Sequence, residues 1–215
     1  MSNFYVIGLA GKKGAGKDSA AAVIQQAVKT EGHGFAKFAF ADPIKRRFMQ
    51  IVGAKTEAEY DQIKRSRATI GSGIAEISMR EVMRGIGMLM RSYDENQFVE
   101  YVRKQILAEY QDHIRYRRSM GSDTYVCITD VRFVNEAAML RTDFGSTIIQ
   151  IVNPNDTSAD THATEQGLPP HTVDTVVENP RECDLPLIDV PRQAHAFSAA
   201  ITDSIRRYVR CRPYD

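Results

Sequence analysis

Cysteine is scarce in this sequence, and its few copies form none of the patterns that build disulfide frameworks or zinc sites. The three copies in 215 residues are Cys127, Cys183 and Cys211, with no Cys-x-x-Cys pair. An odd number of widely spaced cysteines argues against both kinds of structure. The five histidines are equally scattered. We therefore expect a reducing, cytoplasmic compartment.

Long apolar runs and an excess of one charge are missing as well. No apolar stretch approaches 18 residues, and the short run Phe4–Ala10 has no basic residues before it. We therefore expect neither a membrane span nor a secretory signal. The 28 Lys and Arg residues balance 27 Asp and Glu residues, leaving a net charge of +1. This balance disfavours bulk electrostatic binding to nucleic acid or to an anionic membrane.

Short apolar strand patterns alternate with helix patterns along most of the chain, which has the length of one α/β domain. This alternation predicts a parallel sheet covered by helices on both faces. Asp42 is expected to cap the helix that starts at Pro43. The expected strands are Tyr5–Leu9, Phe35–Ala41, Tyr125–Thr129, Thr147–Val152 and Thr172–Glu178, and the main helices are Lys17–Lys29, 43–52, Asn135–Phe144 and Gln193–Val209.

The block from about Thr56 to Arg117 shows no convincing strand and is predicted to be a helical insertion over one edge of the site. Within it, Ser78 is expected to cap a helix over 79–90, with Glu81 near its start. Farther along, the segment Asn153–Pro170 is rich in Pro, Asn, Asp and Thr. That composition predicts a loop or lid.

A phosphate-binding pattern directly follows the first strand and opens the first helix. Residues 11–19 read GKKGAGKDS and satisfy G-x-x-x-x-G-K. Glycines let backbone N–H groups turn toward a polyphosphate, the helix N-terminus adds its positive dipole end, and Lys17 reaches the β and γ oxygens. A bare glycine-rich turn is the alternative. The predicted nucleotide contacts are Gly11, Lys13, Gly14, Ala15, Gly16, Lys17, Asp18 and Ser19.

Acidic residues at two places are candidates for a Mg²⁺ ion. Asp18 stands where this pattern usually has Ser or Thr, so either Asp18 approaches the metal through water or Ser19 replaces the usual ligand. Asp130 ends a buried strand, where it could hold Mg²⁺ through water, and Arg132 two residues later would face a phosphate. The alternative makes Asp130 a helix cap with Arg132 as its surface partner.

Basic residues elsewhere are candidates for a second anion site. Lys45 follows the second strand at the ligand-facing edge. Arg80 and Arg84 repel each other at i, i+4 on one helix that also carries Arg91, which requires either an anion or solvent screening. His162 and Glu165 lie in the polar loop, where we expect lid or loop-folding contacts.

Five segments, in this order, resemble the bacteriophage deoxynucleoside monophosphate kinases. They read GAGKDS at 14–19, ADPIK at 41–45, REVMRGIG at 80–87, DVRFVNEA at 130–137, and DTHATEQGLP at 160–169 followed by VVEN at 176–179. The set spans most of the chain and is fairly specific. Relatives often continue the third segment as Gly-Thr-Asp or Gly-Thr-Glu, whereas this chain has Gly87-Met88-Leu89. The lid also lacks the arginines of adenylate-kinase-like enzymes.

The resemblance implies a P-loop nucleoside monophosphate kinase fold: a three-layer α/β/α core at 1–55 and 120–215, a monophosphate-binding insertion at about 56–118 and a lid at about 153–171. It implies ATP with Mg²⁺ as donor, a deoxynucleoside monophosphate as acceptor, and is compatible with a homodimer. Asn179 would lie near the donor base. Lys17, Asp130 and Arg132 would be catalytic, and the acceptor set would be Lys45, Arg80, Arg84, Gly87, Arg91, Arg132 and Glu136.

These patterns predict direct transfer of the ATP γ-phosphoryl group to a monophosphate, without a covalent intermediate. Arg132, Arg91 or Lys13 could neutralise charge during transfer. Two alternatives stay open. One is a related P-loop kinase acting on dephospho-coenzyme A, which would need a general base for a hydroxyl acceptor. The other is a nucleotide-binding regulatory protein without an acceptor.

Overall fold

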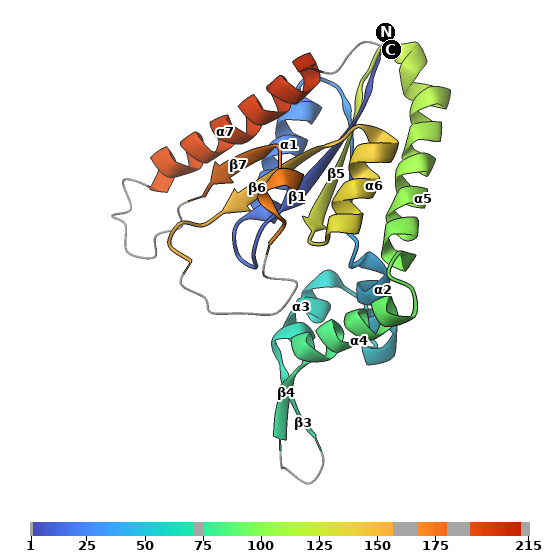
Figure 1. The fold of residues 1–215 in the computed structure, drawn as a ribbon, viewed down its shortest axis with the longest axis vertical. Coiled ribbons are helices and arrows are strands. Elements are labelled where there is room, and N and C mark those ends of the chain that lie inside the picture. Colours follow the sequence, from blue (N-terminus) through green and yellow to red (C-terminus); the bar gives the residue numbers. More distant parts are fainter. Residues whose placement is uncertain (1, 71–74, 157–166, 180–189, 212–215) are drawn as a thin grey trace. The chain divides into compact units, whose positions relative to one another are not determined.

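The computed structural model describes residues 2–70, 75–156, 167–179 and 190–211, and its central feature is a parallel sheet (Figure 1). The five strands have the order β2-β5-β1-β6-β7, and each neighbouring pair is parallel. The predicted α/β fold with a parallel central sheet is therefore confirmed. The strands are β1 Phe4–Ala10, β2 Gly34–Phe38, β5 Thr124–Val131, β6 Thr147–Val152 and β7 Thr175–Glu178.

Helices cover the two faces of this sheet (Figure 1). On one face, Tyr5, Ile7 and Leu9 of β1 join buried residues of α1 and α7 in the main core. On the other face, α6 approaches β1 so closely that a Cβ added to Gly8 would lie 3.2 Å from Leu140. The helices are α1 Lys17–Thr30, α5 Gln97–Asp112, α6 Val134–Phe144 and α7 Val190–Cys211.

The chain divides into two compact units. The first, Met1–Ala39 with Val102–Asp215, contains the sheet, and the second is Phe40–Tyr101. The sequence placed the insertion at about 56–118. The second unit starts earlier because α2 packs against α4, and it stops earlier because α5 carries the fully buried Val102 and Ile106 into the first unit.

The described residues of the second unit include three whole helices, the first turn of α5 and a small antiparallel strand pair. The helices are α2 Asp42–Val52, α3 Glu57–Arg65 and α4 Met79–Tyr93. The strand pair joins β3 Arg67–Ile70 to β4 Ala75–Ser78, antiparallel. The prediction of no strand between 56 and 117 was therefore wrong, because each strand alternates polar and apolar residues over only four positions, too few to distinguish it from a loop.

Capping explains where the helices of this unit begin. Ser78 and Glu81 form the capping box predicted for α4, with the Glu81 N–H donating to Ser78 Oγ at 3.2 Å. The prediction for Asp42 was wrong: the N-cap of α2 is Ala41, and no side chain caps this helix. Asp42 lies in the first turn of α2, where its negative charge interacts favourably with the positive end of the helix dipole. None of the described helices combines the length and apolarity needed to cross a membrane.

Candidate active site

A small polar cavity marks the phosphate-binding loop between β1 and α1. The cavity has a volume of about 120 Å³ and is lined by Gly14, Gly16, Lys17, Asp18 and Ser19. Gly16 is the N-cap of α1, and no side chain caps this end of the helix. The first N–H groups of α1 and its positive dipole end are thus available to an anion. The loop therefore has the local geometry of a phosphate cradle.

The side chain of Lys17 makes two hydrogen bonds to the backbone of the loop. Its ammonium donates to the carbonyl oxygens of Gly11 at 2.7 Å and Lys12 at 2.6 Å. Both acceptors are neutral backbone groups, whereas a phosphate oxygen carries negative charge and makes the stronger, charge-assisted bond. A polyphosphate in the cradle can therefore draw this ammonium from the loop carbonyls.

The cradle opens toward solvent beside its polar residues. Lys13, Gly14, Asp18 and Ser19 are exposed, whereas Ala15 and Gly16 are buried. No group of three or more His, Cys, Asp or Glu side chains in the described ranges could hold a metal alone. Mg²⁺ usually binds one or two carboxylates together with substrate phosphates. The exposed oxygens of Asp18 and Ser19 at the cradle fit an ion that arrives with the nucleotide.

Asp130 lies on β5, the strand next to the one that leads into the phosphate loop. β1 and β5 pair in regular register up to Gly8 and Ile128, but Ala10 pairs with Val131, so β5 holds one extra residue there. Such bulges re-aim side chains and are frequent beside active sites. This bulge places half-buried Asp130 at the carboxyl edge of the sheet, the edge from which the phosphate loop emerges.

Glu136 fixes the backbone around Arg132. Its side chain is 1% exposed, and Oε2 accepts from the backbone N–H groups of Arg132 at 2.8 Å and Phe133 at 3.1 Å. The sequence predicted Glu136 as an acceptor contact. That contact stays a prediction; in the structure this carboxylate accepts from backbone N–H groups at the start of α6 and so helps to fix the direction of the Arg132 backbone.

Asn179 ties the last strand to the phosphate loop. Its side-chain Nδ2 donates to the Ala15 carbonyl oxygen at 2.8 Å, and its backbone N–H donates to Val152 O at 2.8 Å. The predicted contact with the donor base stays a prediction. The observed contact is with the loop itself, across 164 positions of sequence.

Replacing Asn179 with alanine should raise KM for ATP about five- to tenfold, because the carbonyl of buried Ala15 loses a hydrogen-bond partner, which costs about 1 kcal/mol. KM for the acceptor should change little. Steady-state kinetics with each substrate varied in turn would measure both constants. Gln26→Ala is the matched control, since it removes an exposed amide from α1. Equal effects of the two substitutions on KM for ATP would show that the hydrogen bond from Asn179 to the Ala15 carbonyl does not support ATP binding.

The predicted acceptor residues of the second unit lie on α2 and α4. Lys45 is on α2, where its ammonium is 2.6 Å from Glu57 Oε2. Arg80, Arg84 and Arg91 are on α4, and all three are half-buried. The anion site and the solvent-screening alternative for these arginines both stay predictions. Arg91 places its guanidinium 4.5 Å from the centroid of the Phe98 ring.

Gly87 of α4 packs against Ile44 of α2. It is buried, and an added Cβ would lie 2.9 Å from Ile44 Cδ1, the far end of a flexible side chain. A larger residue at this position would therefore require the Ile44 side chain to shift, whether or not a nucleotide contacts it. A direct role of Gly87 in acceptor binding stays a prediction, as do the roles of His162 and Glu165, which lie outside the described residues.

The sequence analysis missed Tyr60, the buried centre of the second unit. Tyr60 follows the start of α3, where Thr56 and Glu59 form a capping box. That S/T-x-x-E signal is visible in the sequence and identifies the start of the helix. The contacts of the Tyr60 ring with α2 and α4 depend on tertiary packing and have no sequence signal.

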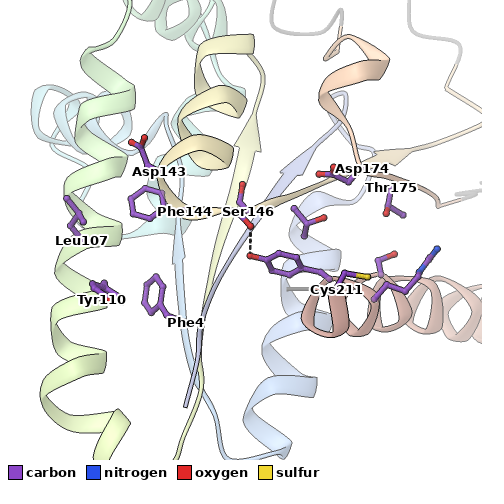
Figure 2. A pocket seen from close by; sticks show the side chains of 14 residues that line it. Phe4, Leu107, Tyr110, Asp143, Phe144, Ser146, Asp174, Thr175 and Cys211 are labelled. Carbon is purple, nitrogen blue, oxygen red and sulfur yellow. Dashed lines mark hydrogen bonds between the residues drawn. The ribbon is translucent and has the colours of Figure 1, made fainter. Parts of the chain in front are cut away.

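A larger cavity, of about 860 Å³, lies in the first unit at the opposite edge of the sheet (Figure 2). It touches Phe4, Thr147 and Thr175, the first residues of β1, β6 and β7. The phosphate loop follows the other end of β1. Tyr208 on its wall donates to Gly145 O at 3.0 Å, and Arg141 pairs with Asp174 at 2.8 Å. This cavity is therefore separate from the phosphate cradle.

Comparison with known proteins identifies the family. A family model described as deoxynucleotide monophosphate kinase matches residues 47–185. The chain belongs to the deoxynucleotide monophosphate kinase family. The matched range begins after the phosphate loop, so the cradle at 11–19 is an observation independent of this match. The loop therefore has the local geometry of a phosphate cradle, and the chain that carries it belongs to a kinase family.

Individual relatives agree with the family match. A protein of Acanthamoeba polyphaga mimivirus, provisionally named deoxynucleotide monophosphate kinase, is 31% identical over 165 residues, covering 74% of this chain and 80% of the relative. The deoxynucleotide monophosphate kinases of Escherichia phage RB69 and Enterobacteria phage T4 are 33% and 28% identical over 105 and 139 residues. Those matches cover 47% and 64% of this chain, and 38% and 54% of the phage enzymes.

Proposed function

We propose that this chain transfers the γ-phosphoryl group of ATP to the α-phosphate of a deoxynucleoside monophosphate, giving a deoxynucleoside diphosphate and ADP. The observation that carries the proposal is the phosphate cradle at the start of α1 in a member of this kinase family. A cradle of backbone N–H groups with one lysine suits the triphosphate of a donor. The acceptor supplies the second phosphate.

The chemistry requires positioning and charge neutralisation more than a strong base. The oxygens of the acceptor phosphate are already ionised, so no side chain must remove a proton before they attack the γ-phosphorus. The P–O bond to the acceptor forms as the bond to the ADP oxygen breaks, in line, and the electron pair leaves with ADP. Lys17 and Arg132 offset the negative charge of the two substrates. Glu136 holds the Arg132 backbone in place.

The remaining roles belong to the same proposal. The loop 11–19 would bind the β and γ phosphates, while Asp18, Ser19 and Asp130 would supply oxygen ligands, directly or through water, for Mg²⁺ bound with ATP. When bound, Mg²⁺ would neutralise charge on the phosphate oxygens. Lys45, Arg80, Arg84 and Arg91 form the acceptor-binding set of the second unit.

A panel of all ribo- and deoxynucleoside monophosphates with ATP, read as ADP formed, tests this function. We expect at least one deoxynucleoside monophosphate to give diphosphate and ADP in equal amounts. Removal of Mg²⁺ by EDTA should abolish the reaction, since charge on the phosphates is then unscreened. Without acceptor, ADP should form far more slowly, because water is a poor competitor in a kinase site.

Dephospho-coenzyme A belongs in the same panel as a hydroxyl acceptor. Its phosphorylation in place of every monophosphate would assign the chain a different acceptor. ADP formation that no monophosphate accelerates would contradict the kinase reaction.

A further inference from the structure

Tyr60 is a fixed aromatic platform within the second unit. Its ring lies on α3 and is only 4% exposed. Its hydroxyl donates to Met83 Sδ of α4 at 3.4 Å, and Phe48 of α2 meets the ring edge-on at a centroid distance of 6.4 Å. Contacts with both neighbouring helices therefore hold the ring in one orientation. Burial, followed by the nearby carboxylates Asp61 and Glu57, raises the pKa of Tyr60 to about 12, so the phenol stays protonated and uncharged near neutral pH.

Two lysine ammonium groups lie at the face of this ring. Lys45 Nζ from α2 and Lys64 Nζ from α3 are each 5.2 Å from the ring centroid. Attraction between an ammonium and the electron-rich face of an aromatic ring restricts where the flexible lysine chain can point. The Tyr60 ring thus keeps the Lys45 ammonium in place without neutralising its charge.

Glu57 supplies a counter-ion for this lysine. Its Oε2 is 2.6 Å from Lys45 Nζ, and the Glu57 side chain is 79% exposed while that of Lys45 is 26% exposed. A carboxylate oxygen on an ammonium reproduces the contact that a phosphate oxygen would make. An ion pair with so exposed a carboxylate is weak, because water and salt screen it. A monophosphate carries more negative charge and can replace it.

We propose that Glu57 is an internal competitor of the acceptor phosphate for Lys45, and that Tyr60 is the positioning residue that keeps Lys45 in place when Glu57 is displaced. The inference rests on the proposed function in one respect, namely that Lys45 receives the acceptor. Beyond that function, it assigns to Glu57 a lowering of acceptor affinity and to Tyr60 the positioning of the Lys45 ammonium. No bond is made or broken in this exchange of ion pairs.

Glu57→Gln should lower KM for an accepted deoxynucleoside monophosphate about two- to fivefold at low ionic strength, the range expected for loss of a weak competing ion pair. KM for ATP should stay unchanged. Equilibrium titration of the same monophosphate without ATP should show the same gain in affinity. High salt should shrink the difference between the variant and the wild type, since the competitor is screened.

Asp61→Asn is the matched control, because it removes the same charge from the same helix at an exposed position one turn away. It should change acceptor affinity less than Glu57→Gln does. In a Lys45→Ala background the gain from Glu57→Gln should disappear, because the two residues act through one contact. Tyr60→Leu removes the aromatic face and should raise KM for the acceptor, whereas Tyr60→Phe loses only the Met83 contact and should raise it less.

The experiments distinguish failure of the Glu57 competitor role from failure of the proposed kinase function. If the wild type phosphorylates no monophosphate, the proposed function fails before any variant is compared. If the wild type is active but neither Glu57→Gln nor Glu57→Ala tightens acceptor binding, the competitor role is wrong while the function stands. A gain that persists without Lys45 would also overturn it. Circular dichroism melting of every variant would show whether each is folded.

Discussion

Lys17→Ala should lower kcat/KM for phosphoryl transfer by about 10²–10³-fold, the usual cost of losing one group that stabilises charge on a transferring group. The ammonium is the cation that lines the cradle at the start of α1. Without it, the γ-phosphate loses its charge-assisted partner as negative charge shifts toward ADP. Coupled measurement of ADP formation over a range of both substrates would give the value.

The same lysine also makes hydrogen bonds within the loop, and its replacement should reduce the stabilisation that ATP gives. Lys17 donates to two loop carbonyls, and the loss of these bonds should destabilise the fold by only about 1 kcal/mol because the carbonyls can bind water instead. ATP should then raise the melting temperature of the variant less than that of the wild type. Thermal melts with and without ATP measure this difference.

Lys29→Ala is the control for this substitution, since it removes an exposed lysine from the other end of α1. It should leave both turnover and the effect of ATP on melting near the wild-type values. Near-normal turnover of Lys17→Ala would remove this lysine from the mechanism.

Local signals in the sequence were sufficient to predict β1, the glycine-rich loop after it and α1. β1 and the glycine-rich turn after it are continuous in the chain, so the single stretch 4–30 specifies strand, cradle and helix. The strands β5 and β6 also follow from short β-branched runs. By contrast, the bulge beside Asp130 arises from the pairing of two strands that are more than 100 residues apart in the sequence. No pattern within β5 itself predicts this bulge.

The second unit was less predictable because its organisation depends on contacts between helices. Lys45 and Glu57 are 12 positions apart on different helices, and their ion pair exists only once α2 and α3 are packed. Asn179 and Ala15 are separated even more widely. The capping contact of Glu136 has no complete sequence signal either, because the N-cap is Phe133, whose side chain cannot supply the hydroxyl half of a capping box.

Gly11→Ala should destabilise the protein by about 2–5 kcal/mol, because both the backbone conformation and the space at this position exclude a side chain. Gly11 has φ +139°, a conformation that is essentially confined to glycine. A Cβ there would lie 2.3 Å from the Ile151 carbonyl oxygen, which belongs to the parallel ladder of β6 and cannot move alone. The loop must then shift, so KM for ATP should also rise more than tenfold.

Gly14→Ala is the comparison that separates conformation from crowding in the same loop. Gly14 also has a positive φ, +77°, but no atom lies within 4 Å of an added Cβ. Its replacement should therefore cost only the left-handed backbone strain, about 1–2 kcal/mol. Urea unfolding of the two variants at equal pH gives both values, and Gly11→Ala should be the less stable. Equal stability of the two variants would mean that contact with β6 does not restrict the conformation of the loop at Gly11. The close packing of the loop against the sheet would then have no role in shaping the phosphate site.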